Sequence, residues 1–233
     1  MKTADVIIVG SGASGLFNAL FLPQDYKVIV ITKKEVEESD SFLAQGGISA
    51  LKNPEDYDSY FEDTMKAGHY ENDKGAVEKM IKESPQIIQD LKDFGVRFDL
   101  KDGEIEFTRE GGHSTFRILH HEDLTGKEIT SHLYEEAKKR DNITIMENCT
   151  MIDIIEKDGE CKGIVYKDAD GNLDTIEAPD TVLATGGLGG LFKHSTNFRH
   201  LTADSLAICL RHNVELENFT LSFQLFQTLV VGG

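Results

Sequence analysis

The sequence has few basic residues and no long apolar run. It carries 24 Lys and Arg against 41 Asp and Glu, which gives a formal net charge of −17 at pH 7. Binding a nucleic-acid backbone requires a basic surface, so we expect no nucleic-acid partner. No apolar stretch approaches the roughly 20 residues that a membrane-spanning helix needs, so we expect no membrane partner either.

Cysteine is also scarce. Cys149, Cys161 and Cys209 are odd in number, far apart, and form no C-x-x-C pair. This spacing predicts reduced thiols and no metal site. A Lys and an early Asp5 precede the first apolar run, which is atypical of a signal peptide, so we expect a cytoplasmic protein.

Three glycines follow the first apolar segment. Residues 5–9 read as a strand, and Gly10, Gly12 and Gly15 then stand at G-x-G-x-x-G spacing before a helical segment. The first glycine permits a sharp turn, the second a close backbone approach to a pyrophosphate, and the third tight packing of helix on strand. A second apolar strand at 27–32 completes a βαβ unit, so the sequence predicts a dinucleotide site.

The rest of the chain alternates helical and extended patterns. Helices are expected at about 14–22, 53–68, 72–95, 125–140 and 202–211, and strands at 143–146, 150–157, 161–166, 173–178 and 181–185. A βαβ unit, a hairpin-rich sheet and a returning strand are typical of two-dinucleotide-binding flavoproteins. We therefore expect an α/β Rossmann-like FAD-binding domain over residues 1–233. It would combine a parallel sheet with a β-hairpin layer and carry a helical and loop insertion at about 50–140.

The end of the second strand bears on which dinucleotide binds. NAD-binding folds usually place Asp or Glu there to bind the ribose, whereas Thr32 and Lys33 stand there in this chain, with Glu35 just beyond. This weakens the prediction of NAD without excluding it.

Several short motifs are spread over nearly the whole chain. They are Gly10-Ser11-Gly12-Ala13-Ser14-Gly15, Ala44-Gln45-Gly46-Gly47-Ile48, Thr108-Arg109-Glu110-Gly111-Gly112-His113-Ser114, Arg117-Ile118-Leu119-His120, Asp123-Leu124-Thr125-Gly126, Ala184-Thr185-Gly186-Gly187 and Thr196-Asn197. With these motifs the chain resembles the succinate dehydrogenase/fumarate reductase flavoprotein superfamily, and within it the L-aspartate oxidase family.

The resemblance implies FAD as cofactor. Some members carry a flavin-linked His before A-Q-G-G, and Asp40 stands there in this chain, so the resemblance implies non-covalent FAD. The implied FAD contacts are Gly10, Ser11, Gly12, Ala13, Ser14, Gly15, Lys33, Asp40, Ser41, Phe42, Leu43, Ala44, Gln45, Gly46, Gly47, Ala184, Thr185, Gly186 and Asp204. Asp204 matches the acid of a G-D-G motif, although Ala203 and Ser205 flank it; it also reads as an acid in the first turn of a helix.

The resemblance also implies a substrate. Glu110 stands where succinate dehydrogenases have Phe, and a carboxylate can pair with an α-ammonium group that succinate lacks. The alternative interpretation of Glu110 is a solvated acidic side chain in a loop. His113 and Ser114 are implied to line the same catalytic pocket, and the spacing of His113, His120 and His121 matches no standard zinc site.

The implied reaction is FAD-dependent oxidation of L-aspartate to iminoaspartate, the first step of quinolinate and NAD biosynthesis. The acceptor would be oxygen or fumarate, and quinolinate synthase a partner. Phe226 stands where the family's substrate-binding His belongs, and the chain stops at Gly233, before the family's capping domain. We therefore expect impaired activity. The alternatives are a non-catalytic FAD-binding remnant and an oxidoreductase like fumarate reductase or succinate dehydrogenase.

Overall fold

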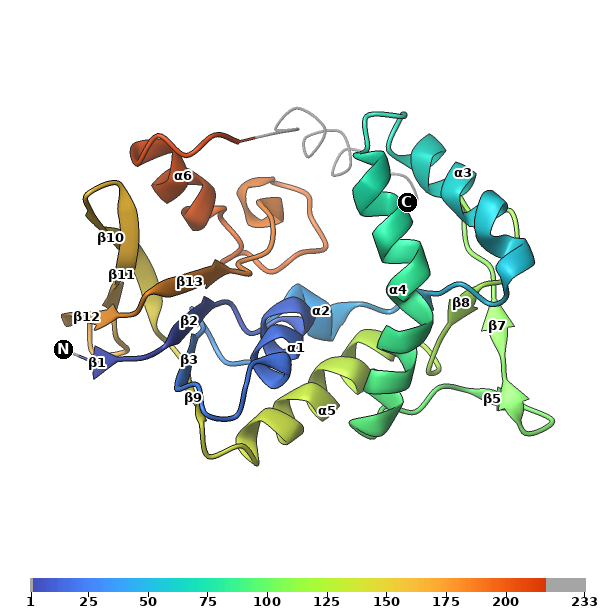
Figure 1. Ribbon diagram of the computed structural model, residues 1–233, viewed down its shortest axis with the longest axis horizontal. Helices are drawn as coiled ribbons and strands as arrows, with labels where there is room; N and C mark the ends of the chain where they lie inside the picture. Colours follow the sequence, from blue (N-terminus) through green and yellow to red (C-terminus); the bar gives the residue numbers. More distant parts are fainter. Residues whose placement is uncertain (1, 217–233) are drawn as a thin grey trace. The chain divides into compact units, whose positions relative to one another are not determined.

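The computed structural model describes residues 2–216, and the segment with Phe226 lies outside them (Figure 1). Contacts between Cα atoms divide the chain into two compact units, Met1–Phe42 with Leu133–Gly233, and Leu43–His132. The second unit is thus inserted in the sequence of the first. No helix within residues 2–216 combines the length and apolar character that crossing a membrane requires.

A four-stranded parallel sheet forms the centre of the first unit. Its order is β13 (Asp180–Leu183), β2 (Val6–Val9), β3 (Val28–Ile31) and β9 (Ile143–Met146). The two middle strands are buried along their whole length, which explains why both are continuous apolar runs. Helix α1 (Ala13–Phe21) connects β2 to β3 and buries its Leu16 and Ala19 side. The predicted α/β class and βαβ unit are confirmed.

A second sheet of the first unit has the order β1 (Lys2–Thr3), β12 (Leu173–Glu177), β11 (Glu160–Lys167) and β10 (Thr150–Lys157). The β10–β11 hairpin turns at Asp158 and Gly159, both with positive φ. Alternate residues of the parallel strands point to opposite faces. The core facing this hairpin layer contains Ile7, Val9, Ile29, Ile31, Met151, Ile164, Tyr166, Ile176 and Ile208. Ile208 belongs to α6 (Asp204–Arg211). The 3₁₀ turn η2 (Gly189–Leu191) also lies in this unit.

The second unit is mainly helical. The turn η1 (Pro54–Asp56), α3 (Tyr57–Ala67) and α4 (Lys74–Asp93) precede the start of α5 (Thr125–Lys138), which continues into the first unit. Its short strands are β4 (Ile48–Ser49), β5 (Leu100–Lys101), β6 (Glu104–Ile105), β7 (Phe107–Thr108) and β8 (Ile118–Leu119). They form a β4–β8–β7 sheet and a β5–β6 hairpin. The short helix α2 (Asp40–Leu43) leads into this unit.

Candidate functional site

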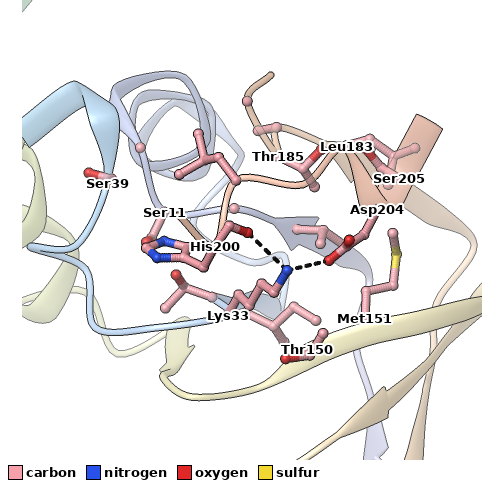
Figure 2. Close-up of a pocket in the computed structure, with 18 of the residues that line it drawn as sticks. Ser11, Lys33, Ser39, Thr150, Met151, Leu183, Thr185, His200, Asp204 and Ser205 are labelled. Atoms are coloured by element: carbon pink, nitrogen blue, oxygen red, sulfur yellow. Dashed lines mark hydrogen bonds and ion pairs between the residues drawn. The ribbon is translucent and has the colours of Figure 1, made fainter. Parts of the chain in front are cut away.

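A cavity of about 500 Å³ lies in the first unit at the carboxyl ends of β2, β3 and β13 (Figure 2). In open α/β sheets, ligands bind beyond these strand ends. The lining comes from the turn after β2, the segment after β3, the start of α2, the start of β10, the end of β13 and the loop before α6. These segments are far apart in the sequence, and the parallel sheet brings them to one edge.

The glycine turn forms one wall of this cavity. Gly10 has φ +114°, and a Cβ atom there would lie 2.1 Å from the carbonyl oxygen of Ala184. A Cβ atom on Gly15 would lie 2.0 Å from the carbonyl oxygen of Gly10. Only glycine therefore fits at these two positions. Gly12 caps α1 without a side chain, so the positive end of the helix dipole faces the cavity rim.

Ser11 tests whether this cavity suits a dinucleotide. Its side chain is 3% exposed, and its Oγ atom has no hydrogen-bond partner within residues 2–216. A buried hydroxyl group without a partner is costly, and a ligand oxygen in the cavity would supply one. The neighbouring Ala13 N–H donates to Ser41 Oγ at 3.0 Å. A pyrophosphate, which offers only acceptor oxygens, suits the Ser11 hydroxyl and the helix N-terminus.

Lys33 and Asp204 form an ion pair at the edge of the cavity. The Lys33 ammonium donates to the His200 carbonyl oxygen at 2.9 Å and to Asp204 Oδ2 at 2.6 Å (Figure 2). It also donates to Thr202 Oγ1 at 2.9 Å. Burial raises the pKa of Asp204, but the hydrogen bonds from Lys33 and Thr202 outweigh it and hold that pKa below its ordinary value. An ionised carboxylate therefore stands at the end of β3, supplied by α6 and not by β3 itself.

Of the two residues flanking Asp204, Ala203 keeps a conformation that glycine would favour, whereas Ser205 is already helical. Ala203 has φ +56° and ψ +36°, the left-handed region, where the resembled motif has Gly. Ser205 is buried, and its hydroxyl group hydrogen-bonds the Thr185 hydroxyl group at the end of β13. This bond ties the start of α6 to the Ala184–Gly186 segment.

Asp40 closes another side of the same cavity. Its carboxylate accepts hydrogen bonds from the Phe198 N–H at 3.0 Å and from the Asn197 side-chain amide. The side chain therefore holds the 197–198 loop. Ser39, Met151 and His200 also line the cavity, although the sequence analysis did not select them. No local pattern marks these three residues, because only the fold brings them to the cavity.

In the second unit, Glu110 lies against the Gln45–Gly47 segment. A Cβ atom on Gly46 would stand 3.3 Å from each carboxylate oxygen of Glu110. Gln45, Gly47, Glu110 and His120 line a hollow of about 350 Å³ together with Thr108, Glu122 and Asp123. The structure therefore brings together the predicted amine-binding carboxylate and the second half of the predicted flavin segment. Phe42 belongs to the first unit, and Leu43 and Ala44 to the second.

Ser114 is held by α3, and the neighbouring His113 ring contacts Arg117. Ser114 donates its N–H and its hydroxyl group to Asp63 Oδ2, at 2.7 and 2.8 Å. Arg117 is fully buried; it pairs with Asp56 at 2.8 Å and Asp63 at 2.6 Å. The hydrogen bonds from Arg117 lower the pKa of Asp56 to about 2. The sequence analysis gave Arg117 no role of its own, although an Arg directly before the apolar strand β8 was a signal.

Three further histidines of the second unit pair with carboxylates. His120 Nδ1 and His121 Nδ1 lie 3.1 and 3.2 Å from the carboxylate of Asp99, and His132 Nε2 lies 3.2 Å from Glu128 Oε1. Within residues 2–216 no group of three or more His, Cys, Asp or Glu side chains could hold a metal ion.

The parallel sheet, the glycine turn and the cavity beyond the strand ends define a dinucleotide-binding α/β protein. The chain belongs to the FAD binding domain family, which it matches over residues 5–231. FAD is therefore its expected cofactor, and the prediction of FAD is confirmed.

Curated relatives define the similarity further. The chain is 43% identical to the L-aspartate oxidase of Clostridium perfringens, over 94% of this chain and 50% of that protein. It is 45% identical to the L-aspartate oxidase of Clostridium acetobutylicum, over 92% of this chain and 49% of that protein. The chain thus spans about half the length of the curated relatives it matches. The predicted resemblance to flavoprotein oxidoreductases of the L-aspartate oxidase type is confirmed.

Solved structures show the same fold. The Sdh1 complex of Mycobacterium smegmatis matches with a TM-score of 0.83 and 32% identity, over 91% of this chain and 39% of that chain. An E. coli quinol fumarate reductase matches with a TM-score of 0.86 and 28% identity, over 91% of this chain and 38% of that chain. The fold is therefore that of the cofactor-binding part of these flavoproteins.

Proposed function

We propose that this chain forms the FAD-binding half of an L-aspartate oxidase and holds FAD non-covalently. The observation that carries the substrate assignment is the carboxylate of Glu110 against Gly46. It places a negative charge beside the segment predicted to follow the flavin ring. An amino acid presents an ammonium group there, whereas succinate and fumarate present none.

The cofactor residues act by position. Gly10 and Gly12 would let the backbone approach the pyrophosphate, and the Ser11 hydroxyl group would donate to it. The Lys33–Asp204 pair and the Thr185–Ser205 bond hold the walls of the cavity in place. Bound FAD supplies a two-electron acceptor for the hydride that leaves the substrate Cα atom. The protein's part is to orient the substrate and to exclude water.

Asp40 supports the non-covalent assignment. Both of its carboxylate oxygens accept hydrogen bonds from residues 197 and 198. A carboxylate cannot form the histidyl–flavin bond of the covalent flavoproteins that the chain resembles. Together with Glu110, this argues against the alternative of a succinate dehydrogenase or fumarate reductase.

The remaining assignments follow from the same proposal. The product would be iminoaspartate, the acceptor oxygen or fumarate, and quinolinate synthase the protein that uses the product. We assign the protein to the cytoplasm, since its three cysteines are free in the structure.

A chimera tests the substrate assignment. Residues 5–216 of this chain would replace the matching segment of the Clostridium acetobutylicum relative, which supplies the other half of the length. We expect aspartate-dependent flavin reduction without oxygen. Glu110→Gln should lower kcat/KM for L-aspartate by about 10- to 100-fold, because a charged hydrogen bond contributes about 1.5–3 kcal/mol.

Glu122→Gln is the matched control, since Glu122 lines the same hollow. Its kcat/KM for L-aspartate should stay within about threefold of the unmodified chimera, a change of less than about 1 kcal/mol. A chimera that reduces its flavin with succinate but not with L-aspartate would contradict the proposal. Equal effects of the two substitutions would do the same.

A further inference from the structure

Arg117 is the one fully buried charged side chain within residues 2–216. Its Nε and Nη2 atoms donate to the two carboxylate oxygens of Asp56, at 2.9 and 2.8 Å. Nη1 donates to Asp63 Oδ2 at 2.6 Å, and the guanidinium group lies 4.9 Å from the ring centre of Tyr60. A two-point pair with one carboxylate, a second carboxylate and an aromatic ring fix the plane of the guanidinium group.

The same guanidinium group faces a histidine. Arg117 Nη1 lies 3.2 Å from His113 Nδ1. A guanidinium group has five N–H donors, no acceptor, and does not lose its proton in proteins. Nδ1 must therefore be the acceptor in this contact, which leaves the ring proton of a neutral His113 on Nε2. Nε2 lies 3.4 Å from Ser49 Oγ, a hydroxyl group that can accept from it.

The loop around His113 is fixed on both sides. Asp63, which pairs with Arg117, also accepts two hydrogen bonds from Ser114. The backbone N–H of His113 donates to the backbone carbonyl oxygen of Glu110 at 3.2 Å. This bond links His113 to the residue that bears the predicted amine-binding carboxylate. Cβ atoms built on Gly111 and Gly112 would have no neighbour within 4 Å. The base of the loop is therefore packed, and its tip is open.

We propose that Arg117 is a positioning residue that fixes His113 as the neutral Nε2–H tautomer. His113 then acts as a hydrogen-bond donor and not as a general base. Its ring lines a cavity of about 580 Å³ together with Ser49, Tyr60 and Gly112. The chemistry that fits an N–H donor there is an oxygen acceptor such as a carboxylate, which would take the Nε2 hydrogen bond in place of Ser49 Oγ, 3.4 Å away. The assignment of that carboxylate to a dicarboxylate substrate rests on the proposed function, whereas the tautomer does not.

Nitrogen NMR of the chain tests the tautomer directly. With ¹⁵N in histidine and arginine, a bare and a protonated ring nitrogen have well-separated shifts, and His113→Gln identifies the His113 signals. At neutral pH we expect a bare Nδ1, a protonated Nε2, and a scalar coupling across the hydrogen bond between Arg117 Nη1 and His113 Nδ1. A protonated Nδ1 would overturn the proposal.

Two arginine substitutions separate positioning from packing. Arg117→Met removes the donor, and we expect loss of the coupling and His113 ring shifts averaged between the two tautomers. Arg109→Met is the matched control; Arg109 belongs to the same loop but stacks on Phe116, 5.6 Å from its ring centre. The control should leave the His113 shifts unchanged. Averaged shifts in the unmodified chain, equal to those of Arg117→Met, would overturn the proposal.

The test does not depend on the stability of a variant or on catalysis. If Arg117→Met does not fold, the spectrum of the unmodified chain still tests the proposal, because the proposal requires the scalar coupling and a bare His113 Nδ1 in that chain. Arg117→Lys, which keeps a donor and the charge, should retain a bare Nδ1 if it reaches the ring, and a protonated Nδ1 in this folded variant counts against the proposal. The measurement needs neither flavin nor substrate, so failure of the proposed function would leave its result unaffected.

Discussion

Replacement of Asp56 by Asn tests the buried ion pair on which the His113 loop rests. The Asp56 side chain is 9% exposed and accepts two hydrogen bonds from Arg117. Ser59 and Thr115 also donate to it, at 2.7 and 2.8 Å. Asn has nearly the same shape but no charge. The substitution therefore removes the charge while it disturbs the packing little.

The size of the effect follows from the pKa of Asp56. That pKa falls from 3.8 to about 2, chiefly because Arg117 donates to the carboxylate. Linkage converts this difference to about 2 kcal/mol of folding free energy. The folded pKa is the lower one, so this stability is fully present above pH 4 to 5 and is lost as the pH falls through 2. At neutral pH the variant should lose about 2–4 kcal/mol, because Arg117 also loses part of its pairing.

Urea unfolding followed by circular dichroism is the suitable assay, since the chain contains no Trp. The helical signal reports largely on the second unit, which contains α3 and α4. We expect the difference between the unmodified chain and Asp56→Asn to shrink as the pH is lowered from 6 towards 2. Asp58→Asn, on the exposed side of α3, should change stability by less than about 1 kcal/mol at any pH. A difference for Asp56→Asn that is independent of pH would refute the reasoning.

Three further predictions concern the first unit. Ala203→Gly should raise the free energy of unfolding by up to about 1 kcal/mol, because Ala203 has a left-handed backbone conformation. Ala207→Gly, inside α6, should lower the free energy of unfolding by about 0.5–1 kcal/mol. Destabilisation by both substitutions would contradict the assigned conformation. Gly10→Ala should abolish FAD retention in equilibrium dialysis, whereas Gly171→Ala, in an open hairpin turn, should retain FAD. Retention by both variants would contradict the argument that a Cβ atom at Gly10 collides with the Ala184 carbonyl group. The carboxylates of Glu156 and Asp153 raise the pKa of His212, so its anchoring of α6 to β10 should be complete below pH 6 and weaken as the pH rises through that raised pKa. Hydrogen-exchange protection of α6 measures this, and the same pH dependence in His212→Gln would count against it.

Local patterns were sufficient to predict the βαβ unit. The continuous apolar runs of β2 and β3 and the glycine spacing between them depend on short-range rules, and the structure shows both strands buried. The end of α5 is placed two residues from the expected position, and the start of α6 two residues later than expected. At α6 the reason is tertiary, because His200, Thr202 and Asp204 bind the ammonium group of Lys33.

Pairings between distant residues were not predictable from any pattern. Lys33 and Asp204 are 171 positions apart, and Asp40 and Asn197 are 157 apart. No rule of spacing joins such residues, and the sequence analysis therefore described Asp204 also as an ordinary helix acid. The pairing of Arg117 with Asp56 and Asp63 likewise joins the residue before β8 to η1 and α3, which lie more than 50 positions earlier. The FAD contacts assigned from the resemblance stay predictions. Ser11 is the member whose assignment has the most direct support, because its buried hydroxyl group has no partner among the described residues 2–216.

Retention of FAD by the purified chain tests the central claim most directly. The chain would be mixed with FAD, freed of unbound cofactor, and examined by visible absorbance before and after denaturation. The account predicts a flavin spectrum that stays with the folded chain and a flavin that separates completely from the polypeptide when the chain is denatured. A chain that retains no flavin, or one whose flavin stays attached after denaturation, would contradict it.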